Sequence, residues 1–145
     1  MRSELNHKKI LAIDYGRKFT GIATYKVNID PYPLMYGRIA YQSDQQLVED
    51  ILKISNEEFA DLLILGIPYF TDGKPSTMTK TVQSFEKLLS TSSRATPVVS
   101  VDETLTTFEA KERMKADPRF NFEIDLKQVD ALSATIILEV FLKSF

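Results

Sequence analysis

The stretch ILAIDYGRKFTGIA, residues 10–23, decides how this chain folds. An apolar run ends on a carboxylate, Asp14, and Gly16 follows two residues later, before a second apolar run. We predict a β-strand over 8–14, a tight turn, and a second strand over 19–27. A carboxylate at the end of a buried strand costs desolvation free energy unless it has a partner. A metal ion, a phosphate-binding loop and an ordinary turn each explain it, so the rest of the chain must decide.

The segments that follow predict an α/β fold. A third strand over 34–41 completes an antiparallel meander, because the three strands are joined by short connections. Alternating elements follow: helices over 44–59, about 77–90, 106 to about 116 and about 126–143, and buried strands over 61–68 and 97–102. The order βββαβαβαα is typical of the ribonuclease H-like architecture. We therefore predict one domain over residues 1–145, a mixed five-stranded sheet with helices on both faces and the first strand central.

Capping signals mark the predicted helix starts. Ser43 and Thr106 each have a Gln or Glu three residues later, which is the spacing of a capping box. Ser76 is placed to cap the helix near 77–90, and Asp125 to cap the closing helix.

Composition restricts the chemistry that this chain can perform. There is no cysteine, which excludes disulfides, thiolate metal sites and cysteine nucleophiles. The single histidine, His7, lies in a polar segment before the first strand, so a Ser–His–Asp triad or a His-rich zinc site is disfavoured. Hydrolytic chemistry would therefore depend on carboxylates.

Charge and hydropathy exclude further classes. The net charge of −2 argues against a non-specific nucleic-acid binder attracted by overall charge. No apolar run reaches the roughly 18–20 residues of a membrane helix, and the N-terminus lacks a signal-type apolar region. We expect a cytoplasmic protein with no membrane partner.

Acidic residues lie at two predicted strand ends. Ligands of open α/β sheets bind beyond the carboxyl ends of the strands, and Asp14 ends the first strand while Asp102 and Glu103 end the last. A turn aspartate is an ordinary explanation for Asp14. A helix N-terminus explains one acid of the second pair, but two adjacent acids repel each other unless they are solvated or bind a metal.

Asp130 is the third acid, and it begins an otherwise apolar face of the closing helix. Positions 134, 137, 138 and 141 continue that face as Ala, Ile, Leu and Phe. A solvated acid in the first helical turn is the alternative explanation. Two strand ends and this turn would bring three carboxylates to one point, where Mg²⁺ or Mn²⁺ would find oxygen ligands and a phosphodiester could be hydrolysed.

The loop over 65–76, LGIPYFTDGKPS, is a second candidate feature. It stops a strand sharply, contains an Asp-Gly turn pair, and leads into a helix whose free N–H groups would suit an anion. A plain strand-to-helix loop explains it equally well. Arg17 and Lys18 beside Asp14 are either phosphate contacts or solvated charges.

Four blocks of the chain together resemble the YqgF/RuvX family, a Holliday-junction-resolvase-like group also assigned to nucleolytic maturation of the 5′ end of pre-16S ribosomal RNA. The blocks occur in the family's order and cover nearly the whole chain: ILAIDYGRKFTGIA, LILGIPYFTDGKPS, VVSVDETLTTFEA and VDALSATIILEVFL. The resemblance implies a ribonuclease H-like nuclease fold, divalent-metal catalysis and a structured nucleic-acid substrate.

The resemblance also implies site residues. The family's acids fall on Asp14, on the pair Asp102–Glu103 and on Asp130. Within the pair we expect Glu103 to bind metal and Asp102 to support it, so the expected catalytic and metal-binding residues are Asp14, Glu103 and Asp130. The expected substrate-binding residues are Arg17, Lys18, Gly66, Pro68, Asp72, Gly73, Lys74 and Thr106.

This chain departs from the family pattern at Thr104, where the family usually has Arg between Asp-Glu and Leu-Thr-Thr. An arginine would make a bidentate phosphate contact that threonine cannot make. Arg17 stands where a small hydroxyl residue is common, and it is a candidate for the compensating charge.

Three classes of function follow from these residues. The first is a metal-dependent endonuclease, with precursor 16S ribosomal RNA as the expected substrate and branched DNA, as in a Holliday junction resolvase, as the alternative. The second is a nucleotide-binding ATPase of the actin/Hsp70 kind, which needs two such domains. The third is a non-catalytic module that binds RNA, or ribosome-associated or transcription proteins. A monomer and a homodimer are both compatible with the sequence.

Overall fold

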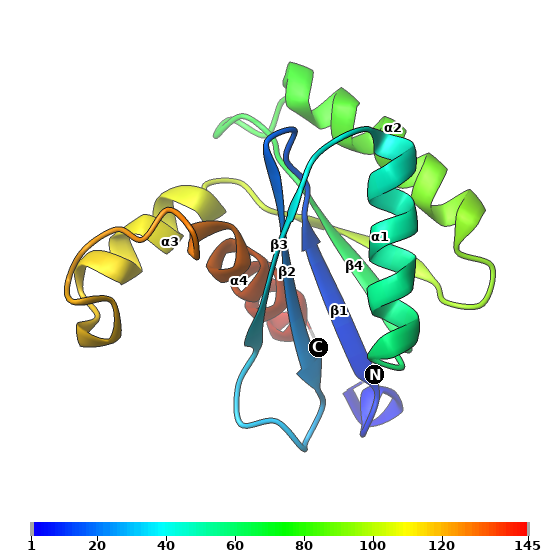
Figure 1. The fold of residues 1–145 in the computed structure, drawn as a ribbon, viewed down its shortest axis with the longest axis horizontal. Coiled ribbons are helices and arrows are strands. Elements are labelled where there is room, and N and C mark those ends of the chain that lie inside the picture. The colour runs from blue at the N-terminus through cyan, green and yellow to red at the C-terminus, as the bar shows by residue number, and fades with distance from the viewer. Residues whose placement is uncertain (1, 145) are drawn as a thin grey trace.

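A computed structural model describes residues 2–144, and it contains one five-stranded sheet with helices on both faces (Figure 1). The strands are β1 (Lys9–Asp14), β2 (Phe19–Lys26), β3 (Leu34–Ala40), β4 (Leu62–Ile67) and β5 (Val98–Asp102). The helices are α1 (Asp44–Glu57), α2 (Thr77–Ser92), α3 (Thr106–Lys115) and α4 (Val129–Lys143), with short 3₁₀ helices at Arg2–Leu5 and Pro118–Phe120.

The sheet order confirms the predicted fold. The strands lie in the order β3-β2-β1-β4-β5, so β1 is central. The pairs β1–β2 and β2–β3 are antiparallel, whereas β4 is parallel to both β1 and β5. The carboxyl ends of β1, β4 and β5 therefore meet at one end of the sheet.

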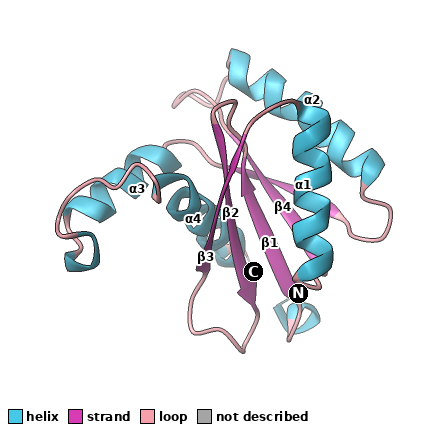
Figure 2. Cartoon of the chain, viewed as in Figure 1, coloured by secondary structure: helices cyan, strands magenta, loops and turns pink. Residues whose placement is uncertain are grey.

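The alternation of side chains along β1 assigns its residues to two cores. Leu11 and Ile13 pack with α1 and α2 on one face, and Ile10 and Ala12 pack with α4 on the other. Figure 2 shows these helices on opposite sides of the strands. Because successive side chains of a strand alternate between the two faces, Asp14 belongs to the α4 face.

Helix α4 is buried on more sides than the sequence pattern indicates. The predicted face of Ala134, Ile137, Leu138 and Phe141 is confirmed, since it lies in the core against β1, β2 and β4. Its opposite side, with Leu132, packs against α3 in a separate small cluster. Within residues 2–144, no helix is long and apolar enough to cross a membrane.

The prediction that 97–102 is a buried strand is wrong. Strand β5 is at the edge of the sheet, and residues such as Val99, with 40% of its surface exposed, face solvent. An apolar run does not distinguish a central strand from an edge strand, because position in the sheet is decided by tertiary pairing.

Two of the predicted helix caps are correct. Ser43 Oγ accepts a hydrogen bond from Gln46 N–H at 3.1 Å at the start of α1, although the Gln46 side chain binds Asp50 instead of closing a box. Ser76 and Thr79 form a full capping box at α2. The Thr79 hydroxyl also donates to the carbonyl oxygen of Pro68, which ties the preceding loop to this helix.

The other two predicted caps are wrong. Leu105 precedes α3 in the left-handed conformation, φ 67°, with no side-chain cap, and the Thr106 hydroxyl donates to Glu103 instead. Helix α4 begins at Val129, later than predicted, because Asp125 organises the turn before it. The Asp125 carboxylate accepts hydrogen bonds from Lys127 N–H and the Gln128 side chain.

Candidate active site

Asp14 is the last residue of the central strand, and two glycines flank it. Gly21 of β2 pairs with it directly. On the other side Ile13 pairs with Leu65 of β4, so Gly66 lies level with Asp14. The glycines leave two gaps on the sheet face beneath α4, and a part of another acidic residue fills each gap.

Glu103 fills the gap at Gly66. Its backbone N–H donates to the Ile67 carbonyl at 3.1 Å, which holds the chain beside the end of β4. A Cβ atom on Gly66 would lie 2.8 Å from Cδ of Glu103. The Glu103 side chain is only 6% exposed, and its Oε2 accepts a hydrogen bond from Thr106 Oγ1 at 3.0 Å. Glu103 is therefore held on the sheet beside Asp14.

The backbone of Asp130 fills the gap at Gly21. A Cβ atom on Gly21 would overlap the carbonyl oxygen of Asp130, the second residue of α4. Any side chain at this position of β2 would push the start of the helix off the sheet. Gly21 therefore places Asp130 at the level of Asp14, with the Asp130 side chain only partly exposed.

The pKa values of the neighbouring Asp14 and Glu103 carboxyls are both raised. Burial raises the pKa of Asp14 well above its ordinary value, and the charge of Glu103, a hydrogen bond with Glu103 and the charge of Asp130 raise it further. Burial is also the largest cause of the raised pKa of Glu103. Two carboxylates this close resist joint ionisation unless a cation accompanies them.

Ser133 lies one turn after Asp130 and faces the pair. Its hydroxyl interacts with Asp14 and lowers the pKa of that acid, which opposes the effect of burial. However, Ser133 Oγ is fully buried and makes no hydrogen bond of standard geometry within the described part of the chain. A buried hydroxyl without a partner is uncommon, and here it provides an additional oxygen beside the acids.

Asp130 lies farther from the pair. Burial raises its pKa, while the positive charges of Arg38 and Lys111 lower it. It acts on Asp14 through its charge and forms no hydrogen bond with either acid. Across residues 2–144, no three His, Cys, Asp or Glu side chains are close enough to hold an ion together. The expected convergence of three acids is therefore only partial: Asp14 and Glu103 lie together, and Asp130 stands apart.

The donor atoms at this site fit a hard divalent cation. All of them are oxygens, from the Asp14 and Glu103 carboxylates and the Ser133 hydroxyl. Mg²⁺ in proteins is commonly bound by one or two carboxylates, with water and substrate phosphates completing its shell. The chemistry of these donor atoms is therefore compatible with such an ion.

An open pocket of about 380 Å³ lies in front of Asp14 and Asp130. Arg17, Lys18 and Arg38 line it, so two acids are surrounded by three cationic side chains. Arg17 is exposed and its Nε donates to the Tyr15 hydroxyl at 3.4 Å. The remaining lining residues are Tyr15, Gly16, Phe19, Thr107, Leu126 and Val129.

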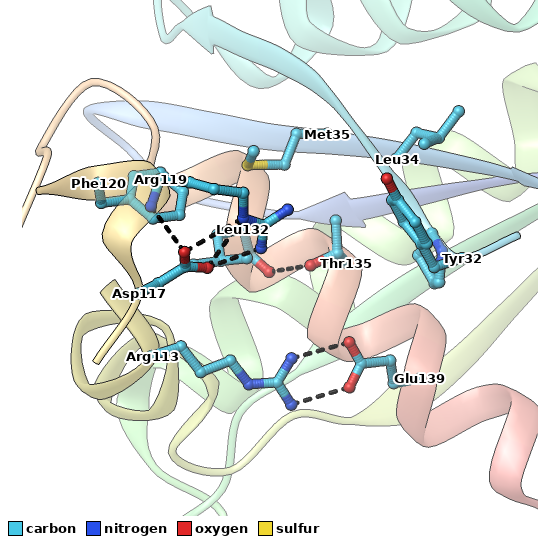
Figure 3. A pocket seen from close by; sticks show the side chains of 11 residues that line it. Tyr32, Leu34, Met35, Arg113, Asp117, Arg119, Phe120, Leu132, Thr135 and Glu139 are labelled. Carbon is cyan, nitrogen blue, oxygen red and sulfur yellow. Dashed lines mark hydrogen bonds and ion pairs between the residues drawn. The ribbon is translucent and has the colours of Figure 1, made fainter. Parts of the chain in front are cut away.

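A larger pocket, of about 610 Å³, lies between β3 and the α3–α4 pair (Figure 3). Its charged groups are already paired with one another. Both terminal nitrogens of Arg113 donate to Glu139 at 2.8 Å, and Arg119 pairs with Asp117 at 2.7 Å. None of the three candidate acids lines this pocket. We assign the candidate site to the smaller pocket, because carboxylates with shifted pKa values and unpaired cations meet there.

Comparison with known proteins agrees with this geometry. Residues 8–144 match the RuvX family, described as Holliday junction resolvase. The chain belongs to the RuvX family. A protein of Crocosphaera subtropica described as "Putative pre-16S rRNA nuclease" is 34% identical over 135 residues, covering 91% of this chain and 90% of the relative. A protein of Rippkaea orientalis with the same description is 34% identical over 143 residues, covering 92% and 94%.

A solved structure shares the fold of this RuvX-family chain. T. thermophilus RuvC in complex with a Holliday junction substrate aligns with a TM-score of 0.61 over 95% of this chain and 96% of RuvC. The two sequences are only 12% identical, so the likeness supports the ribonuclease H-like resolvase fold alone.

The RuvX-type Asp-Glu pair divides into two environments. Glu103 is buried beside Asp14, whereas Asp102 is exposed and its Oδ1 accepts hydrogen bonds from Thr104 N–H at 3.0 Å and from Thr104 Oγ1 at 2.6 Å. Asp102 therefore acts on the site through its charge, which raises the pKa of Glu103. Thr104, which replaces the usual family arginine, holds Asp102 instead of extending toward a substrate. Thr106 is buried against Glu103, and its neighbour Thr107 lines the pocket.

The RuvX-type loop after β4 lies at the same end of the sheet but does not line the pocket of Asp14. Asp72 Oδ1 accepts the Lys74 N–H at 2.9 Å, which closes the turn on itself. Gly73 adopts φ +85°, a conformation that favours glycine. The Lys74 side chain is exposed, and Gly66 acts through the space it leaves for Glu103.

Sequence reasoning missed Arg38, Lys111 and Ser133. A serine such as Ser133 inside an apolar helix carries no signal of its own, and the sequence pattern does not define which face of its helix Lys111 occupies. Arg38 is in an edge strand with mostly exposed side chains, where a charge is ordinary. The one available signal was that Arg38 is the only charged residue of its strand. Only the strand register shows that it lies beside the site.

Proposed function

We propose that this protein is a divalent-metal-dependent endonuclease that hydrolyses phosphodiester bonds of structured nucleic acid. Its proposed substrate is precursor 16S ribosomal RNA, cleaved at the 5′ end. The observation that carries the proposal is the Asp14–Glu103 pair: Glu103 is buried beside Gly66, and Asp14 lines a pocket with a cationic rim. Two carboxyl groups held this close disfavour joint ionisation, and a divalent cation would offset that cost, which supports the proposal.

Asp14 and Glu103 would hold Mg²⁺ or Mn²⁺, which when bound would polarise a phosphate oxygen and lower the pKa of a bound water. The chain's own groups prepare this site. Thr106 fixes the orientation of Glu103 through its hydroxyl. Asp130 presents a partly exposed carboxylate to the pocket, where it is placed to accept a proton from an attacking water. Arg17 and Lys18 would bind phosphates on the open side.

The choice of ribosomal RNA as substrate rests on the relatives. Two proteins that are 34% identical to this chain are each described as "Putative pre-16S rRNA nuclease", and each is covered over at least 90% of its length. Likeness to RuvC is confined to the fold, so junction DNA is the alternative substrate in the same test. We further propose cytoplasmic action on the precursor, together with ribosome-associated proteins.

The test is a cleavage assay on a labelled panel. A ribosomal-precursor RNA end, single-stranded RNA, duplex DNA and a four-way DNA junction are each incubated with Mg²⁺, Mn²⁺ or chelator. Wild type is compared with Asp14→Asn and with Asp50→Asn, a matched control on α1, which lies on the opposite face of the sheet.

We expect metal-dependent cleavage of the precursor RNA by wild type and by Asp50→Asn. Asp14→Asn should lose at least about 10²-fold in rate, because even groups that only support metal ligands contribute 10–100-fold. Cleavage of the junction alone would assign the protein to DNA. Absence of cleavage in every lane by folded protein would refute the nuclease and favour a binding module.

A further inference from the structure

The register of the sheet places Arg38 in the same row as Asp14. Asp14 of β1 pairs with Gly21 of β2, and Gly21 pairs with Arg38 of β3. Residues directly opposite each other in antiparallel strands point to the same face, so Arg38 is on the α4 side with Asp14. Two strand spacings separate the Cα atoms of Asp14 and Arg38 by about 10 Å. Both side chains line the pocket that also contains Asp130.

The Arg38 side chain is held in place from two sides. Its guanidinium lies over the ring of Phe19, with Cζ 3.6 Å from the ring centroid. Its Nη1 donates to the Leu126 carbonyl at 3.4 Å, in the segment that leads into α4. An arginine stacked on an aromatic ring loses less side-chain entropy on binding an anion than a freely rotating one does.

Most N–H donors of the Arg38 guanidinium have no acceptor within residues 2–144. Apart from the Leu126 contact, no acceptor engages it within residues 2–144, and it forms no ion pair with the nearby acids. Arg113 and Arg119 differ, because each is already paired with a carboxylate. A partly buried arginine that lines this pocket and forms no ion pair is suited to bind the anionic group of a ligand.

We propose that Arg38 binds a non-bridging oxygen of a backbone phosphate and thereby positions the nucleic acid over Asp14 and Asp130. The ligand chemistry is a phosphodiester, since a guanidinium offers paired N–H donors that match two phosphate oxygens. Arg38 thus supplies a phosphate contact in a chain whose Thr104 is turned toward Asp102. The assignment rests on the proposed function and adds a residue that selects the backbone rather than a base.

The salt dependence of binding tests this assignment. Binding of a labelled precursor-RNA end is measured in Ca²⁺, without turnover, over a range of salt concentrations. Loss of one phosphate contact lowers the slope of log K against log salt by about 0.7 for single strands and about 0.9 for a duplex. We expect that decrease for Arg38→Gln, which keeps the aliphatic stem and its packing, together with about a tenfold loss of affinity.

Two further variants separate charge from structure. Arg38→Lys should keep the wild-type slope while binding more weakly, because lysine retains the charge but not the paired donors. Arg94→Ala, in the exposed loop between α2 and β5 at the opposite end of the sheet, should match wild type. Circular dichroism and urea unfolding confirm that each variant is folded.

The outcomes distinguish the two proposals. Binding by wild type with an unchanged slope for Arg38→Gln overturns the role of Arg38 and leaves the nuclease proposal intact. No binding of RNA or of a four-way junction by wild type overturns the proposed function and this assignment together. A reduced slope for Arg38→Gln, with wild-type behaviour of Arg94→Ala, supports it.

Discussion

Among single residues, two glycines matter most to this site, because they have no Cβ atom. Gly21 and Gly66 flank Asp14, and the spaces beside them hold the Asp130 backbone and the Glu103 side chain. The sequence shows both glycines but not their neighbours, because the contacts join strands, helix and loop that are far apart in the chain.

Replacing Gly66 with Ala should displace Glu103. The new Cβ would lie 2.8 Å from Glu103 Cδ, closer than real Cβ contacts allow. We expect unfolding free energy to fall by about 1–3 kcal/mol, as for other overpacked sites. The cleavage rate should fall by about 10²-fold, since small displacements of catalytic groups have effects of that size. Urea unfolding and single-turnover kinetics measure the two effects.

The same substitution in a Glu103→Ala background is its control. The new Cβ would also lie 2.5 Å from Ile137 Cδ1. Removing the Glu103 side chain relieves only the overlap with Glu103, so the stability cost of Gly66→Ala should shrink but not vanish. An equal cost in both backgrounds would show that Gly66 does not act through Glu103.

The Asp14 carboxyl should make the metal-free protein less stable as pH rises. Because its folded pKa is raised above 3.8, the unfolded state loses the proton first. The contribution of Asp14 to stability is therefore most favourable below about pH 4 and decreases as pH rises toward the folded pKa. Asp14→Asn removes this titration, so its unfolding free energy should exceed that of wild type at pH 6–7 but not at pH 3.

Urea unfolding in chelator, at intervals between pH 3 and pH 7, measures that difference. Asp50→Asn, which removes a carboxylate remote from the pair, is the control and should follow the wild-type pH profile. If the unfolding free energies of wild type and Asp14→Asn changed in parallel with pH, the Asp14 carboxyl would not destabilise the folded protein as predicted. Addition of Mg²⁺ should stabilise wild type more than Asp14→Asn.

Among the helices and strands, the helix starts show which features can be predicted from neighbouring residues alone. Ser76 and Ser43 cap their helices as predicted, since a cap involves only residues within one turn. Thr106 has the same spacing to an acid, yet its hydroxyl turns back to Glu103. A hydrogen bond to the loop before the helix, three residues back along the chain, thus replaced the predicted cap.

Ser76→Ala should destabilise the protein by about 1 kcal/mol, because it removes the side-chain acceptor of the capping box at α2. Ser84→Ala, on the exposed surface in the middle of the same helix, is the matched control and should be neutral or slightly stabilising. Urea unfolding compares them. Equal stabilities would mean that the α2 box contributes nothing to the folded state.

In the whole molecule, the net charge and the charge around the pocket have opposite effects on the binding of a polyanion. The net charge of −2 disfavours attraction of a polyanion, whereas Arg17, Lys18 and Arg38 gather at one pocket. The acids in that pocket oppose a phosphate until a cation balances them.

Binding of RNA should therefore depend on divalent ions. We expect chelator to weaken wild-type binding of a precursor-RNA end by about tenfold or more, measured by filter binding at constant ionic strength. Asp14→Asn removes a proposed metal ligand, so its binding of RNA should respond less to chelator than that of wild type. Binding that is indifferent to chelator in both proteins would place the RNA elsewhere on the surface.

The sequence alone determined the order and type of the elements, the acidic strand ends and the family, because periodicity, strand ends and motif blocks are local properties. Tertiary structure decided that β5 is an edge strand, that Glu103 rather than Asp102 lies beside Asp14, and that Asp130 stands apart. It also placed Arg38 in the row of Asp14. These facts depend on strand register and on helix contact with the sheet, which arise from pairings between segments distant along the chain.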